Sequence, residues 1–203
     1  RPIGAPMSDY HALVSTADFG ISGPEALGLA GLGAYRFTGL VDPYRLFGTP
    51  VETAESHVIR VEGPVDAYME TLRAASAKKF KNWRRLDHKL EREYGAVTVG
   101  APDRDPGTLQ TLIDWKRDQL HRTGGHDFLG PDWTQALLQA LFEMQDGDMQ
   151  GLMIGLYADG QLVAGHFGVR RGDAYHPWLA AANPEMAAIS PGTVSRWVKL
   201  SPS

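Results

Sequence analysis

The sequence contains no cysteine among its 203 residues, which excludes disulfides, thiolate metal sites and a cysteine nucleophile. It also lacks an apolar run near the roughly 20 residues that a membrane-spanning helix needs, and its N-terminus lacks the charged-then-apolar pattern of a secretion signal. A formal charge of −4 gives no overall attraction to nucleic acid or to an anionic membrane. These absences predict a cytoplasmic protein with no membrane span.

The remaining composition is typical of a soluble globular protein, with 43% hydrophobic and 22% charged residues. One large domain or two small ones would fit this length, and we predict an N-terminal half over 1–100 and a C-terminal core over 101–203. The chain starts at Arg1 without an initiator methionine and stops about two helical turns after Gly192. We therefore expect a fragment whose C-terminal core is incomplete.

Residues 151–193 form the most informative stretch. Two alternating apolar runs flank Asp159-Gly160, a dipeptide that accepts the positive φ of a tight hairpin turn. Arg171-Gly172 offers a second, weaker turn, so three consecutive strands are predicted. Ser190-Pro191-Gly192-Thr193 then opens a short helical run, where unpaired backbone N–H groups and the helix dipole favour an anion such as a phosphate.

Apolar spacing and turn residues predict the other elements. Helices are expected over 24–35, after Pro64, over 77–94 with Gly95 as the C-cap, over 108–122, and over 133–145 with Asp132 as the N-cap. Short strands are expected over 35–41, 57–61 and 96–99.

The helix over 77–94 carries the densest charge in the chain. Its apolar stripe includes Phe80, Trp83 and Leu86, while Lys81 and Arg85 belong to a basic stripe on the far side. One interpretation makes the basic stripe a docking surface for phosphates, RNA or an acidic carrier protein. The other makes it a solvated helix face. Since no aromatic residue interrupts the stripe, stacking on single-stranded bases is not supported.

Two histidines in the three-strand stretch are candidate catalytic residues. A hairpin that turns at Arg171-Gly172 would place His166 and His176 nearly opposite one another and on one face. They would then serve as a general base and its hydrogen-bond partner, as two of three metal ligands, or as structural histidines. Pro177 cannot donate to a sheet ladder, so the third strand is predicted to lie at an edge or to contain a bulge.

Other aromatic and imidazole side chains suggest weaker sites. Trp178 would line an acyl or sugar pocket, or it would simply pack in the core. His121 and His126 match no helical or zinc-ligand spacing, so we expect surface residues and no metal site.

Taken in order, these motifs resemble the GNAT acyltransferase fold. The passage AGHFGVRRGDAYHPWLAAANPEMAAISPG carries the resemblance. DYHALVS and KKFKNWRRLDHKLEREYG resemble a branch of bacterial acetyltransferase-like proteins associated with cellulose and exopolysaccharide biosynthesis. The resemblance implies an α/β (α+β) protein whose mixed, mostly antiparallel sheet is flanked by helices.

The same resemblance implies an acyltransferase that uses acetyl-CoA or another acyl-CoA. Its acceptor would be an amine or hydroxyl of a small molecule or saccharide. Main-chain groups of Leu179, Ala180 and Ala181 would stabilise the oxyanion and hold the donor. The implied pyrophosphate site comprises Ser190, Gly192, Thr193 and Val194. The implied acceptor site comprises Asp9, Tyr10 and Trp178.

The sequence departs from the family pattern in two places. A glutamine or arginine followed by spaced glycines is absent, and a Ser-Pro-Gly variant stands in its place. The branch also continues past the final helix to a further strand, which this chain does not reach. Two alternatives therefore remain: a transferase whose donor is an aminoacyl-tRNA or an acyl carrier, and a non-catalytic GNAT-like binding module.

Overall fold

The computed structural model describes residues 7–8, 10–14, 20–37, 39–50 and 52–186. By the contacts within the chain, these residues divide into two compact units, Arg1–Ile59 and Arg60–Ser203.

A short helix orders part of the first unit. α1 (Gly23–Leu29) begins at a capping box in which Ser22 and Glu25 each accept a backbone N–H from the other residue. The helix predicted over 24–35 therefore exists but is shorter. It ends early because the glycines that follow favour turns, and Gly31 has a φ of 68°.

The strands predicted over 35–41 and 57–61 are wrong, whereas the strand predicted over 96–99 is present as β1 (Val97–Gly100). In the described residues of 35–41 and 57–61, the strand pairing consists of one isolated parallel bridge between Leu40 and His11. Aromatic and β-branched residues favour a strand only when a neighbouring strand supplies hydrogen bonds and packing. These segments lack such a neighbour among the described residues and follow an irregular path.

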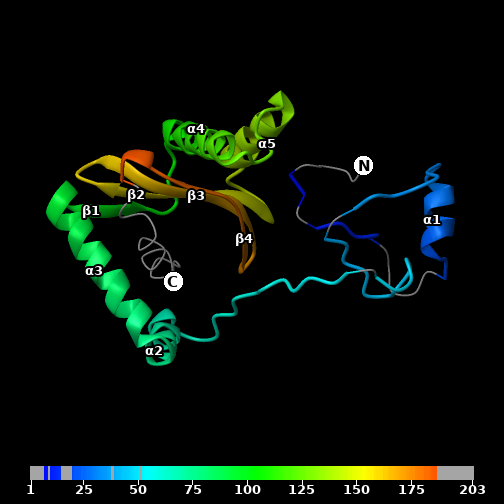
Figure 1. The fold of residues 1–203 in the computed structure, drawn as a ribbon, viewed down its shortest axis with the longest axis horizontal. Helices are drawn as coiled ribbons and strands as arrows, with labels where there is room; N and C mark the ends of the chain where they lie inside the picture. The colour runs from blue at the N-terminus through cyan, green and yellow to red at the C-terminus, as the bar shows by residue number, and fades with distance from the viewer. Residues whose placement is uncertain (1–6, 9, 15–19, 38, 51, 187–203) are drawn as a thin grey trace. The chain divides into compact units, whose positions relative to one another are not determined.

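The second unit is an α/β structure built on one antiparallel sheet (Figure 1). Its four strands lie in chain order, each paired with the next. The strands are β1 (Val97–Gly100), β2 (Met149–Ala158), β3 (Gln161–Arg171) and β4 (Ala174–Ala182). The helices are α2 (Val65–Ala75), α3 (Ala77–Tyr94), α4 (Pro106–Thr123) and α5 (Asp132–Glu143), and a 3-10 turn follows at Pro184–Met186. The predicted fold class is confirmed.

Helices cover both faces of this sheet. Figure 1 shows α4 and α5 along one face and α3 on the other. On the α4 and α5 face, the fully buried Phe167 ring of β3 lies 6.5 Å from the Phe142 ring of α5. On the α3 face, Leu90 belongs to one buried cluster with Leu156 and Ala164 of the sheet. None of the helices in the described part of the chain is long and apolar enough to cross a membrane.

Local sequence signals placed most of these elements correctly. β2 and β3 meet at the predicted Asp159-Gly160 turn, where the two residues have φ angles of 48° and 79°. Gly95 caps α3 with a φ of 92°, as predicted. The N-cap of α5 differs, because Pro131 takes that position and Asp132 becomes the first helical residue.

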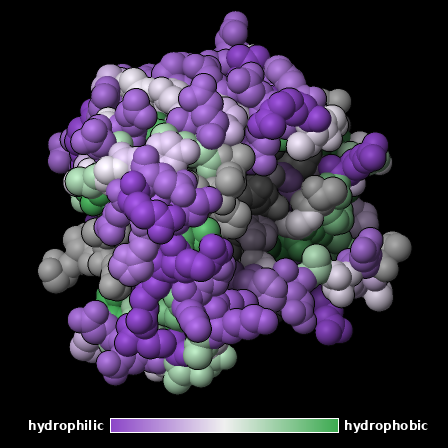
Figure 2. Space-filling view, turned by 60° about the vertical axis from the view of Figure 1, so that its left-hand side comes forward, coloured by the Kyte–Doolittle hydropathy of each residue, from purple (hydrophilic) through white to green (hydrophobic). Residues whose placement is uncertain are grey.

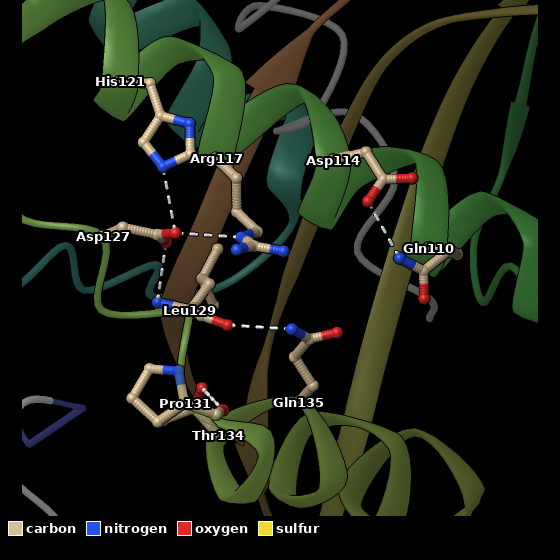
Figure 3. Close-up of polar contacts among 9 residues, drawn as sticks. All are labelled: Gln110, Asp114, Arg117, His121, Asp127, Leu129, Pro131, Thr134 and Gln135. Atoms are coloured by element: carbon tan, nitrogen blue, oxygen red, sulfur yellow. Dashed lines mark hydrogen bonds and ion pairs between the residues drawn. The ribbon is translucent and has the colours of Figure 1, made fainter.

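Asp127 fixes the loop between α4 and α5 (Figure 3). Its Oδ2 accepts hydrogen bonds from Arg117 Nε at 3.0 Å and from His121 Nε2 at 3.2 Å, and its Oδ1 accepts the Leu129 N–H. Burial raises the pKa of the Asp127 carboxyl, but the hydrogen bond and charge of Arg117, with the other two donors, outweigh burial and hold the pKa below its usual value. The loop thereby anchors Leu129, which is fully buried.

Replacing Asp127 with Asn should lower the free energy of unfolding by about 1–2 kcal/mol at pH 7, because two charge-assisted hydrogen bonds are lost at a partly exposed site. Asp114→Asn is the matched control, since that exposed carboxylate accepts one hydrogen bond from Gln110 at 2.9 Å. Urea denaturation measures both variants. Because the folded-state pKa of Asp127 is lowered, its contribution is present above the unfolded pKa of about 3.9 and disappears as the pH falls through the folded-state value. A loss equal to that of Asp114→Asn would contradict the anchoring role.

Candidate active site

β4 carries a bulge where it pairs with β3. Phe167 lies opposite Leu179 but Gly168 lies opposite Pro177, so one extra residue, Trp178, is accommodated between them. A Cβ on Gly168 would stand 2.9 Å from the Pro177 Cα, which shows how closely the two backbones approach. The predicted irregularity at Pro177 is confirmed.

β4 is also an edge of the four-stranded sheet formed by the described residues. Alternate backbone N–H and C=O groups of an edge strand point away from its neighbour and can bind a ligand. A bulge turns further groups out of the ladder. This stretch of β4 therefore offers main-chain donors next to the side chains of β3.

The imidazole of His166 forms a hydrogen bond with a tyrosine on the neighbouring strand. The Tyr175 hydroxyl lies 2.8 Å from His166 Nδ1, and the two rings meet edge to face with centroids 5.4 Å apart. Tyr175 lies opposite Arg170, which is four residues from His166 on β3. Because side chains alternate between the faces of a strand, Arg170, Tyr175 and His166 share one face of the sheet. Both side chains are half-buried.

Burial controls the protonation of this pair. It lowers the pKa of His166 to about 4, and it raises the pKa of the Tyr175 hydroxyl above its usual value. Both groups are therefore uncharged at neutral pH. A neutral imidazole held by a protonated phenol can exchange a proton with a substrate at its other nitrogen.

His176 does not lie opposite His166, so that prediction is wrong. His166 pairs with Ala180 and His176 pairs with Val169, which places the two imidazoles on opposite faces of the sheet. Arg171 lies opposite Ala174, so the turn falls one residue later than predicted, which shifts each cross-strand partner by two residues and leaves the faces unchanged. In either register His176 lies opposite Phe167 or Val169, both on the face of β3 opposite to His166, because side chains alternate along the strand. His176 is exposed, and its Nδ1 accepts a hydrogen bond from Trp178 Nε1 at 3.2 Å.

A family model described as the acetyltransferase (GNAT) domain matches residues 77–200, more than half of the chain. The chain belongs to this family. The match begins at the start of α3 and takes in every strand described above. GNAT domains transfer acyl groups and generally use an acyl-CoA as co-substrate. No curated protein and no solved structure matches the chain.

Three of the residues expected to bind the donor lie in β4 of the GNAT domain. Leu179 is buried opposite Phe167, Ala180 is exposed opposite His166, and Ala181 is half-buried. Trp178, expected in the acceptor site, is half-buried at the bulge. The structure thus brings His166, Ala180 and the bulge together on adjacent strands.

The remaining expected site residues are elsewhere in the chain. Ser190, Gly192, Thr193 and Val194, expected to hold the pyrophosphate, lie outside the described residues, as does Asp9. Tyr10 is exposed in the first unit, where its hydroxyl lies 2.5 Å from Ser56 Oγ. Within the described part of the chain, no group of three or more His, Asp or Glu side chains is arranged to hold a metal ion.

Sequence reasoning missed Tyr175 as the partner of His166. Its position in the strand pattern gave no sign of a polar role, because aromatic residues are common in strands for packing alone. A turn at Arg171-Gly172 or at Gly172-Asp173 puts Tyr175 on the His166 face, opposite Gly168 or Arg170. The missing information was the packing that brings the Tyr175 hydroxyl to His166 Nδ1.

Proposed function

We propose that this GNAT domain transfers an acyl group from acetyl-CoA or another acyl-CoA to an amine or hydroxyl of a small molecule or saccharide. The observation that supports this proposal is the neutral His166–Tyr175 pair beside the bulged edge strand β4. The resemblance of DYHALVS and the α3 sequence to the exopolysaccharide-associated branch favours a saccharide acceptor in a bacterial biosynthetic pathway. Trp178, half-buried at the bulge, is then a candidate for the acceptor site.

In this proposal His166 is the base. The acceptor nitrogen or oxygen attacks the thioester carbonyl carbon, the new C–N or C–O bond forms, and the C–S bond breaks to release the thiolate. His166 accepts the acceptor's proton at Nε2, directly or through one water, while Nδ1–H donates to the Tyr175 oxygen. The proton then passes to the departing thiolate. His176 is the alternative base, since it lies on β4 next to the bulge.

The low pKa of His166 suits an amine acceptor. A neutral amine becomes positively charged as it attacks, so the proton it must lose is acidic and a weak base can accept it. A base with a pKa of about 4 is also fully available at neutral pH, because almost none of it is already protonated. Main-chain N–H groups around Leu179, Ala180 and Ala181 would stabilise the oxyanion.

Donor binding can be tested before any acceptor is identified. Acetyl-CoA and longer acyl-CoA thioesters should raise the apparent unfolding temperature of the chain in a concentration-dependent way, by an amount equivalent to about 2.7 kcal/mol when the ligand is at 100 times its Kd. ADP is the control ligand, because it shares the nucleotide diphosphate but lacks the thioester arm. The absence of a shift with every acyl-CoA, for a protein that unfolds cooperatively, would move the assignment to a transferase with another donor, such as an acyl carrier or an aminoacyl-tRNA, or to a non-catalytic binding module.

A further inference from the structure

α3 carries an excess of positive charge on a chain that is acidic overall. Its 18 residues hold seven lysines and arginines against three carboxylates, a net charge of +4, whereas the whole chain has a net charge of −4. The cations are Lys78, Lys79, Lys81, Arg84, Arg85, Lys89 and Arg92. Figure 2 turns the side of the molecule that carries α3 toward the viewer, and hydrophilic residues cover most of the surface that it shows.

The positive charge is uncompensated only in the first half of the helix. The ion pairs of α3 lie toward its C-terminus, where Lys89 and Arg92 both approach Glu93, at 3.9 and 3.5 Å. In the part of the chain that the structure describes, Lys78, Lys81 and Arg85 form no ion pair, and all three are exposed. We call these three residues the α3 basic stripe.

Helix stability does not explain this arrangement. The N-terminal end of a helix carries partial positive charge, so each cation in the first turn is unfavourable by roughly 0.3–1 kcal/mol. α3 begins with Lys78 and Lys79, has no acidic residue in its first turn and has no side-chain cap. Its apolar side is already occupied, since Phe80 and Leu90 are buried.

The dimensions and surroundings of the stripe indicate the kind of partner. From Lys78 to Arg85 the helix rises only about 10 Å, which is short for a nucleic acid site that must neutralise many phosphates. The stripe contains no aromatic residue on which bases could stack. The rest of the chain is acidic and would repel a long polyanion. A short row of carboxylates on another protein's helix matches both the length and the charge.

We propose that the α3 basic stripe docks an acidic carrier protein that presents the acyl group as a thioester on a phosphopantetheine arm. This inference rests on the proposed function, because such a carrier offers the same reacting thioester as acyl-CoA. The bond changes are also the same: the acceptor nitrogen or oxygen bonds to the carbonyl carbon, the C–S bond breaks, and the acceptor's proton ends on the carrier's thiol. Contacts at α3 take the place of the nucleotide in holding the donor.

The test is a binding titration with two donors, acetyl-CoA and an acetylated holo acyl carrier protein. The charge-reversal variant is Lys78→Glu/Lys81→Glu/Arg85→Glu, and the control variant Arg60→Glu/Arg104→Glu/Arg122→Glu makes the same charge change at exposed positions outside α3. We expect the stripe variant to weaken carrier binding by about tenfold or more at 50 mM salt, and less at 200 mM. The control variant should bind the carrier within about threefold of the unmodified protein, and both variants should bind acetyl-CoA as the unmodified protein does.

The outcomes separate this inference from the proposed function. Binding of acetyl-CoA without binding of the carrier overturns the docking inference and leaves the acyltransferase proposal intact, whereas binding of neither donor overturns both. Equal loss of carrier binding in the two triple variants also overturns the docking inference, because the loss would then result from the change in net charge and not from the position of the charges. A tRNA competitor that binds more tightly than the carrier, and loses that binding in the stripe variant, assigns the stripe to RNA instead. Lys81→Gln/Arg85→Gln, which only removes charge, replaces the triple variant if circular dichroism shows that the latter is unfolded.

Discussion

Replacing His166 with Ala should lower kcat by about 10²–10⁴-fold while the affinity for acyl-CoA changes by less than about threefold. The imidazole is proposed to accept the acceptor's proton, a role that matters in the transition state and contributes little to ground-state binding of the donor. Steady-state kinetics with a saturating amine acceptor, together with a separate donor titration, measures the two quantities.

His176→Ala is the matched control for this experiment. It removes the same side chain from an exposed position on the opposite face of the sheet, and its turnover should stay within about threefold of the unmodified enzyme. A large loss in His176→Ala and none in His166→Ala would transfer the base role to His176. Unchanged turnover in both variants would remove histidine from the mechanism.

The low pKa of His166 also fixes the sign of two pH effects. The neutral imidazole is the active form, so the activity that depends on His166 should rise as the pH increases through about 4 and be constant for this group above about 5. Unfolding should become easier as the pH falls from about 6.5 to about 4, because in that interval the unfolded chain holds the proton that the folded chain does not. His166→Ala should lose this part of the acid destabilisation, and an identical pH profile of stability in the variant would contradict the buried, neutral state.

Replacing Phe167 with Ala should lower the free energy of unfolding of the second unit by about 3–5 kcal/mol. This ring is fully buried at the centre of the sheet, packs against Phe142 of α5 and lies opposite Leu179 at the start of the bulge. Its removal leaves a cavity that the flanking helix and strand cannot easily close. Urea denaturation gives the free energy, and the donor titration shows whether the bulge keeps its shape.

Met149→Ala is the control on the same sheet, because that side chain is 44% exposed at the start of β2. It should cost less than about 1 kcal/mol. If Phe167→Ala were no more destabilising than this control, the sheet and α5 would not form the packed core described here. Loss of donor binding in a folded Phe167→Ala protein would link the bulge directly to the donor site.

Local sequence patterns predicted the elements whose signals lie within a few consecutive residues. α3 follows from the 3-4 spacing of its apolar stripe and from Gly95, and the β2–β3 hairpin follows from Asp159-Gly160. These features depend on backbone φ preferences and on helix amphipathicity, which act over short distances along the chain. The GNAT resemblance rested on the order of the same elements, and the family match covers the residues that carry it, apart from DYHALVS near the N-terminus.

The predictions of strands over 35–41 and 57–61 were wrong because strand formation does not depend on short-range signals alone. Their residues suit a strand, but a strand forms only where a partner is available, and strand propensity contains no information about the partner. The N-cap of α5 differs from the prediction by one residue, because Pro131 takes the position expected for Asp132.

By itself, the sequence determined the antiparallel three-strand unit, the amphipathic α3 and the presence of imidazoles on two adjacent strands. Only the tertiary structure decided which of those imidazoles is paired with a tyrosine in a half-buried position. His176 pairs with Val169 on the face opposite to His166, whereas Tyr175 pairs with Arg170 on the His166 face, where its hydroxyl reaches His166 Nδ1. The alternation of side chains along a strand assigns each residue to a face, but which side chains on that face touch depends on their packing, and no short-range signal fixes that packing.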